Sequence, residues 1–149
     1  MNDWESMKLL IDTNVILDVL LRRGPFDEPA VKVLSLTRRE DIQEYISASA
    51  VTDIYYIANR QMKDSTAVKD LLKRLLTVVS VAAVSEQEIQ NALCLPWADF
   101  EDAVQYSVAL LNEMDGIITR NPKDYQTASV RVWLPEEALE ALASSCQGR

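Results

Sequence analysis

The sequence predicts an α/β domain built on a parallel β-sheet. Short apolar runs, typical of strands that are covered on both faces, alternate along the chain with amphipathic segments of helical period. Strands that alternate with helices pair in parallel, because each helix returns the chain to the same end of the sheet. The chain has 149 residues, 48% of them hydrophobic, and no linker or repeat interrupts it. We therefore expect a single domain spanning residues 1–149.

Four or five segments have the composition of strands. The first is a continuous apolar run that stops at Asp12, and the later ones are rich in β-branched residues. Their short length favours strands over buried helices. The predicted strands are 9–11, 45–48, 78–84, 116–119 and 130–133.

Helical patterns fill the segments between these strands. After the first strand, Val15, Ile16 and Val19 recur at helical spacing until Gly24-Pro25 ends the pattern. The remaining helices are expected at 28–39, from Ser49 or Thr52 to 62, at 65–76, 86–93 and 99–113, and from Pro135 onward.

Two details of these helices are predicted as well. Val31 belongs to the core-facing side of the helix at 28–39. Ser85 and Glu88 have the spacing of a capping box, in which each side chain satisfies a backbone amide at the start of a helix.

Acidic residues stand at the edges of the apolar segments. Asp12 ends the first strand, Asp53 follows the second, and Asp99 and Asp102 lie three residues apart at the start of a helix; Asn121 follows the fourth strand. Carboxylates are costly to bury without a partner. Because the carboxyl ends of parallel strands meet at one edge of a sheet, we expect these groups to form one site.

Several of these residues also fit ordinary structural roles. Asp12 and Asp99 both have the position of a helix N-cap. Asn14 either orients the Asp12 carboxylate or caps the same helix. Asp18 and Glu101 are predicted to be solvated helical acids.

The composition restricts the chemistry of such a site. The chain contains no histidine and two cysteines, which excludes a histidine-based triad and disfavours zinc. Oxygen donors suit a hard cation, so we expect Mg²⁺ or Mn²⁺. The metal candidates are Asp12, Asp53, Asp99 and Asp102.

Charge and hydropathy exclude other classes of protein. A formal net charge of −8 argues against a passive nucleic-acid coat protein, which needs clustered cations. No apolar run is long enough for a membrane span, and the polar first five residues differ from a secretory signal. We expect a cytoplasmic protein.

The segment after the fourth strand combines a hydroxyl, an amide and two cations. Thr119, Arg120, Asn121 and Lys123 lie around Pro122, which by itself indicates a turn. These cations are expected to contact a phosphate held at the acidic cluster. A divalent ion among the acids would suit hydrolysis of a phosphodiester, since it polarises the phosphoryl oxygens and acidifies a water.

In segments 10–15, 47–53, 99–103 and 118–124, the chain resembles the PIN-domain (PilT N-terminus) family, which includes VapC-like ribonucleases. The resemblance implies a three-layer α/β/α fold with sheet order 3-2-1-4-5. It also implies RNA cleavage dependent on Mg²⁺ or Mn²⁺, a homodimer and, for a toxin, an antitoxin partner. By motif, Asp12, Asp53, Asp102 and Asn121 match the four site positions, and Thr119 matches the hydroxyl beside the fourth.

Two residues depart from the family pattern. The second acid is usually Glu, where this chain has Asp53, and the fourth is often Asp, where it has Asn121. The first hypothesis is an endoribonuclease in which Asn14, Thr119, Arg120 and Lys123 contact the RNA or position it. The second is a weak or inactive PIN scaffold that binds RNA or a protein. A phosphatase with an Asp12 nucleophile is disfavoured, because Asn14 stands where such enzymes have a second Asp.

Overall fold

The computed structural model describes residues 6–125 and 129–147, and it contains a five-stranded sheet in the order β3-β2-β1-β4-β5. Every pair of neighbouring strands is parallel, which confirms the predicted α/β class and strand order. The strands are β1 (Met7–Ile11), β2 (Ile42–Ser47), β3 (Ser80–Ala82), β4 (Gly116–Ile118) and β5 (Arg131–Trp133). Residues 1–5, used above for localisation, lie outside the described residues.

Helices connect these strands as predicted, with small differences at their ends. They are α1 (Thr13–Leu20), α2 (Asp27–Ser35), the 3-10 turn η2 (Leu36–Arg38), α3 (Ala48–Met62), α4 (Ser65–Leu75), α5 (Glu86–Cys94), α6 (Phe100–Leu111), the 3-10 turn η3 (Pro122–Tyr125) and α7 (Pro135–Gln147). The capping box of Ser85 and Glu88 is present. The cap of α3 is Ser47, not Ser49 or Thr52, because the chain turns directly from β2 into the helix.

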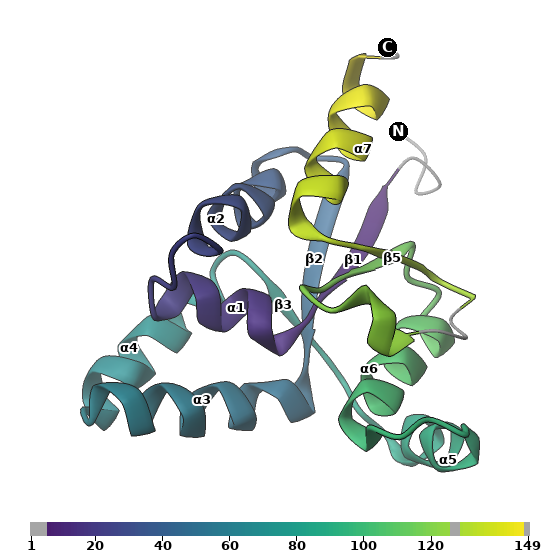
Figure 1. The fold of residues 1–149 in the computed structure, drawn as a ribbon, viewed down its shortest axis with the longest axis horizontal. Coiled ribbons are helices and arrows are strands. Elements are labelled where there is room, and N and C mark those ends of the chain that lie inside the picture. Colours follow the sequence, from purple (N-terminus) through teal and green to yellow (C-terminus); the bar gives the residue numbers. More distant parts are fainter. Residues whose placement is uncertain (1–5, 126–128, 148–149) are drawn as a thin grey trace.

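The helices form a layer on each side of the sheet (Figure 1). One core joins the sheet to α1, α2, α3, α4 and α7, and includes Leu9, Ile46 and Leu142. The other lies against α5 and α6, and includes Leu10 and Ile117. Side chains alternate between the two faces along a strand, so neighbours such as Leu9 and Leu10 enter different cores. Both faces are covered, which explains why β1 reads as a continuous apolar run.

Two expectations about helix 28–39 were wrong. The segment is divided into α2 and η2, and Val31 is 47% exposed. The residues of α2 that are buried are Ala30, Val33 and Leu34, which face α1 and α7. The helical spacing was right, but the position of α7 decided which side of α2 became the core side. None of the described helices is long and apolar enough to cross a membrane.

The strand register brings the site segments together. Ile11 lies opposite Ile118 in the pairing of β1 with β4. The ladder continues one residue further, since the Asp12 amide donates to the Ile118 carbonyl at 2.9 Å, and the Thr119 amide donates to the Trp133 carbonyl at 2.9 Å. Asp12 and Thr119 therefore leave adjacent strands at the same edge of the sheet.

Candidate functional site

Asp12 is held in place by donors from several parts of the chain. It is the N-cap of α1 and is 8% exposed, and its carboxylate accepts a hydrogen bond from the Thr13 amide at 2.7 Å. Gln105 Nε2 donates to Oδ1 at 3.1 Å, and Thr119 Oγ1 donates to Oδ2 at 2.8 Å. Tyr125 adds a longer bond to Oδ2 at 3.4 Å. A carboxylate with this many donors is held in one orientation.

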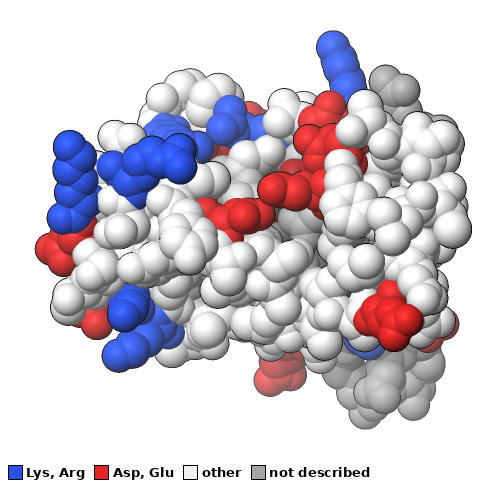
Figure 2. Space-filling view, turned by 90° about the horizontal axis from the view of Figure 1, so that it is seen from below, with Lys and Arg blue, Asp and Glu red and all other residues white. Residues whose placement is uncertain are grey.

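A hollow beside Asp12 is lined by further acids from α3 and α6. Its walls include Asp12, Asp53, Glu101 and Asp102, with Ser49 at its edge. Figure 2 looks onto this edge of the sheet and shows acidic side chains in a band across the middle of the face, with most of the lysine and arginine side chains on the left of the view. The three acids Asp12, Asp53 and Asp102, which are far apart in the sequence, thus meet at one place.

The carboxyl of Asp102 titrates far from its usual range. Burial, together with the negative charges of Asp12, Asp99 and Asp124, raises its pKa to about 7. Asp99 caps α6 by accepting a bond from the Asp102 amide at 3.0 Å, which fixes the two acids next to each other. Acids this crowded repel one another, so the site favours either a proton or a cation.

Glu101 is exposed, as expected for a solvated acid, but it also has a place in the site that was not expected. It lines the same hollow, and burial raises its pKa, together with the charge of Asp53 and a hydrogen bond to it. Helical spacing alone placed Glu101 on another side of the helix from Asp102, but α3 packs close enough to the start of α6 for Glu101 to meet Asp53.

The residues after β4 take separate positions. Thr119 is fully buried, and its hydroxyl accepts the Asn121 amide at 3.1 Å while donating to Asp12. The side chain of Asn121 is exposed. Asn14 accepts the Arg120 amide at 3.3 Å, so it holds the two segments together, and the cap of α1 is Asp12 rather than Asn14.

Arg120 and Lys123 face different surroundings. Arg120 Nε lies 2.7 Å from Asp18 Oδ2, and its guanidinium lies 4.1 Å from the centre of the Phe26 ring. Asp18 is 1% exposed, so its expected role as a solvated acid was wrong. Lys123 is exposed and lines a second hollow with Asp99 and Asp102. The structure therefore brings Lys123, but not the guanidinium of Arg120, to the acids.

Replacing Arg120 by Gln is expected to lower the free energy of unfolding by about 2 kcal/mol. Burial raises the pKa of Asp18, and Arg120 is the main charge that opposes this shift. Breaking a fully buried pair costs about 3–5 kcal/mol, and partial exposure of Arg120 reduces this value. Urea denaturation measures the change.

The matched control is Arg60→Gln, at an exposed position of α3. Adding Asp18→Asn to Arg120→Gln is expected to restore part of the stability, since it removes the uncompensated charge. Equal stability of Arg120→Gln and Arg60→Gln would contradict this role of the ion pair.

Two residues in contact with Asp12 were missed from the sequence. Gln105 lies one turn after Asp102 on α6, so the three-residue spacing that linked Asp99 to Asp102 also pointed to it. Tyr125 ends η3, directly after the polar segment 119–124. Its hydroxyl gave no signal, because a tyrosine at the end of a turn is commonly just a core residue.

The acids fit a divalent cation in chemistry, but they are not closed around one. Carboxylates are the ligands that Mg²⁺ and Mn²⁺ prefer, and burial together with the neighbouring acids raises the pKa of Asp102. Within residues 6–125 and 129–143, no group of three or more acidic or cysteine side chains is arranged to hold a metal ion.

The fold and the arrangement of acids define a PIN domain. A family model described as "PIN domain" matches residues 8–123, so the chain belongs to this family. The chain is 24% identical over 140 residues to "Ribonuclease VapC1" of Aquifex aeolicus (strain VF5), covering 91% of this chain and 95% of that protein.

Solved structures show the same fold at low sequence identity. VapBC2 from Rickettsia felis, bound to a DNA fragment from its promoter, has a TM-score of 0.66 and 13% identity, covering 86% of this chain and 98% of that chain. Mycobacterium tuberculosis VapC20, described as a sarcin-ricin loop cleaving toxin, has a TM-score of 0.59 and 18% identity, covering 73% of this chain and 86% of that chain.

Proposed function

We propose that this PIN domain is a metal-dependent endoribonuclease that hydrolyses RNA phosphodiester bonds. The proposal rests on one observation: Asp12, Asp53 and Asp102 come from three separate parts of the chain and line one hollow. The similarity to a protein named as a ribonuclease supports it. Acids clustered in this way destabilise the fold, because their charges repel, so the cluster indicates a functional site such as one for phosphodiester hydrolysis.

Asp12, Asp53 and Asp102 would hold Mg²⁺ or Mn²⁺, with Asp99 and Glu101 at the edge of the site. Such an ion stabilises charge on the phosphoryl oxygens and makes a water more acidic. Gln105 and Thr119 keep the Asp12 carboxylate oriented toward the hollow. Residues that orient a metal ligand in this way strengthen both binding and activity.

The groups around the acids have distinct proposed roles. Lys123 contacts a phosphate of the RNA backbone, since it lines the same hollow as Asp99 and Asp102. Asn121 positions a water or a phosphate from the exposed edge of the site, and Thr119 supports it through the bond to its amide. Asn14 and Arg120 contribute by holding α1 against the segment after β4.

A scaffold without activity is the second candidate function. Two observations favour it, namely the amide of Asn121 in place of a fourth acid and the open arrangement of the acids in the described part of the chain. Under this alternative the chain would bind RNA or a protein but no divalent ion. Titration with Mn²⁺ therefore separates the two candidates.

An antitoxin protein is the proposed partner, because one chain of a toxin-antitoxin complex from Klebsiella pneumoniae has a similar fold. A surface groove of about 310 Å³ between α1, α2 and α4 provides a place for the antitoxin. Its walls are mainly apolar, with Arg38 and Arg74 at the margin, and Val31 is exposed beside them. This combination suits an amphipathic segment with acidic flanks. A small neighbouring gene whose product copurifies with this chain would support the pairing.

The test of the proposed function is Mn²⁺ binding and RNA cleavage by the full chain, compared with Asp102→Asn. Because the pKa of Asp102 is about 7, its carboxyl holds a proton at lower pH, and a metal ion must displace it. We expect the Mn²⁺ affinity to fall roughly tenfold for each pH unit below 7. Asp102→Asn should bind more weakly and lose most of this pH dependence.

Calorimetry at several pH values measures the affinity, and gel analysis of labelled RNA with and without a chelator measures cleavage. The control variant is Asp70→Asn, at an exposed site on α4. Absence of specific Mn²⁺ binding would reject the enzyme and leave the scaffold. Cleavage that persists undiminished in the chelator would reject the role of the metal.

A further inference from the structure

A second hollow adjoins the acidic one and is large enough for part of a ligand. Its volume is about 330 Å³, within the range of about 300–1,000 Å³ for small-molecule pockets. Asp102 lines both hollows, which makes them neighbours. The remaining walls come from the loop before α6 and from η3, including Trp97, Lys123 and Asp124.

Trp97 forms an aromatic wall whose orientation is fixed by two tyrosines. Its ring stacks on Tyr106 with the centroids 4.9 Å apart and an angle of 29° between the planes. The ring of Tyr125 meets it edge-on at 5.7 Å, and Tyr125 is itself bonded to Asp12. Trp97 is therefore a rigid surface next to the proposed cleavage site, held by Tyr106 and by Tyr125.

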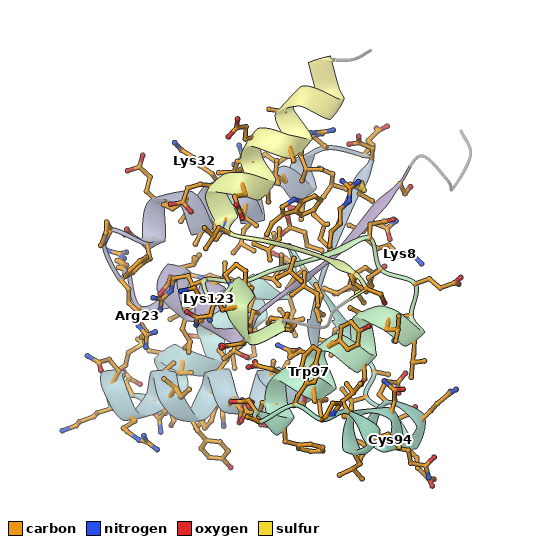
Figure 3. The ribbon with its side chains drawn as sticks, turned by 45° about the vertical axis from the view of Figure 1, so that its right-hand side comes forward. Lys8, Arg23, Lys32, Cys94, Trp97 and Lys123 are labelled. Atoms are coloured by element: carbon orange, nitrogen blue, oxygen red, sulfur yellow. The ribbon has the colours of Figure 1, made fainter. Side chains whose placement is uncertain are left out.

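The polar groups of this hollow suit one nucleotide. Lys123 is the cation of its lining, and it lies with Trp97 on the side of the ribbon that faces the viewer in Figure 3. Inside a double helix both faces of a base are covered by the neighbouring base pairs, so a base that stacks on tryptophan must lie outside a helix. An adjacent phosphate would then lie between Lys123 and the acids.

We infer that this hollow binds the unpaired base next to the phosphodiester bond that is cut, with Trp97 as the stacking surface and Lys123 as the contact to its phosphate. The inference rests on the proposed ribonuclease function and names its substrate as RNA that is single-stranded at the site of cleavage. Stacking accepts any base, so it selects for unpaired RNA more strongly than for sequence.

The first test uses the fluorescence of Trp97. The chain has three tryptophans, and Trp4→Phe with Trp133→Phe leaves Trp97 alone. With Mg²⁺ present, adenosine 5′-monophosphate is expected to quench this fluorescence saturably, and ribose 5-phosphate is expected to leave it unchanged. No saturable quenching, or equal quenching by the sugar phosphate, would overturn the inference.

The second test compares Trp97→Leu with Trp97→Phe in the unaltered background. Loss of stacking should weaken the binding of single-stranded RNA by about 5- to 150-fold and raise KM, and Phe should recover most of the affinity. A purely structural effect through Tyr125 and Asp12 would lower kcat instead. Phe100→Leu is the control, at an exposed aromatic position of α6 outside both hollows.

The two tests separate failure of the inference from failure of the proposed function. Quenching is measured without cleavage, so quenching by a protein that never cleaves RNA would reject the ribonuclease alone. Cleavage with an unchanged KM in Trp97→Leu would reject the base-binding hollow alone.

Discussion

Asp12→Asn is expected to reduce metal-dependent RNA cleavage by at least about 100-fold while the protein stays folded. Loss of a residue that merely supports a metal ligand costs about 10- to 100-fold, and Asp12 is proposed as a ligand itself. The substitution also places an amide group among the donors of Gln105 and Thr119, which leaves at least one of them without an acceptor. We expect that mismatch to cost about 1–3 kcal/mol, less than the stability of a typical domain.

Cleavage of labelled RNA and circular dichroism, measured on the same samples, check both halves of this prediction. The exposed Asp70→Asn variant again provides the matched control, since it removes one negative charge far from the hollow. If Asp12→Asn cleaves RNA at the wild-type rate, the acidic hollow is not the active site. If it unfolds, Asp53→Asn tests the same hollow without disturbing a helix cap.

Glu44→Gln is expected to stabilise the protein, by an amount that grows with pH. Glu44 lies on β2 opposite Leu9, is 3% exposed, and neither oxygen of its carboxyl has a hydrogen-bond partner. Burial in the apolar core raises its pKa to about 8. The folded protein therefore keeps a proton on Glu44 that the unfolded chain releases above pH 4.5.

The sign of the effect follows from this proton. Where the folded state binds more protons, its stability falls as the pH rises. The wild type therefore has its full stability below pH 4.5, and it loses stability as the pH rises toward the folded-state pKa of about 8. The free energy of unfolding of the wild type falls by about 3 kcal/mol at pH 7 and by about 5 kcal/mol above pH 8. Gln at position 44 cannot ionise, so the variant does not lose this stability.

Urea denaturation from below pH 4.5 to above pH 8 measures this difference. The free energy of unfolding of Glu44→Gln should equal that of the wild type at the acid end and exceed it progressively toward the alkaline end. Glu40→Gln, at an exposed position just before β2, is the control and should follow the wild type throughout. Parallel curves for Glu44→Gln and the wild type would show that Glu44 is ionised in the fold.

The order of elements and the meeting of the acids were predictable because both depend on local signals. The apolar run before Asp12 and the alternation of strands with helices indicate a parallel sheet, and parallel strands deliver their following residues to one edge. The PIN family resemblance then supplied the order of the strands. Asp12, Asp53 and Asp102 follow from these two facts.

The surroundings of individual acids were not predictable, because they depend on contacts between distant segments. Asp18 and Glu101 have the sequence context of surface acids, yet Arg120 covers the first and Asp53 meets the second. Glu44 alternates with polar neighbours on a strand, and nothing local shows that α1 and α3 cover that face. Contacts with segments distant in the sequence therefore determine how far each acid is buried and which groups it meets.

The double use of Asp12, as the residue that begins α1 and as part of the acidic hollow, has a consequence for how such proteins diverge. A substitution of Asp12 that abolishes activity also removes the N-cap of α1, so another residue must replace that cap. Asp53 and Asp102 lie within α3 and α6 and begin no helix, so they can drift more freely. Descendants without activity are therefore expected to retain the aspartate at 12 long after the other two have changed.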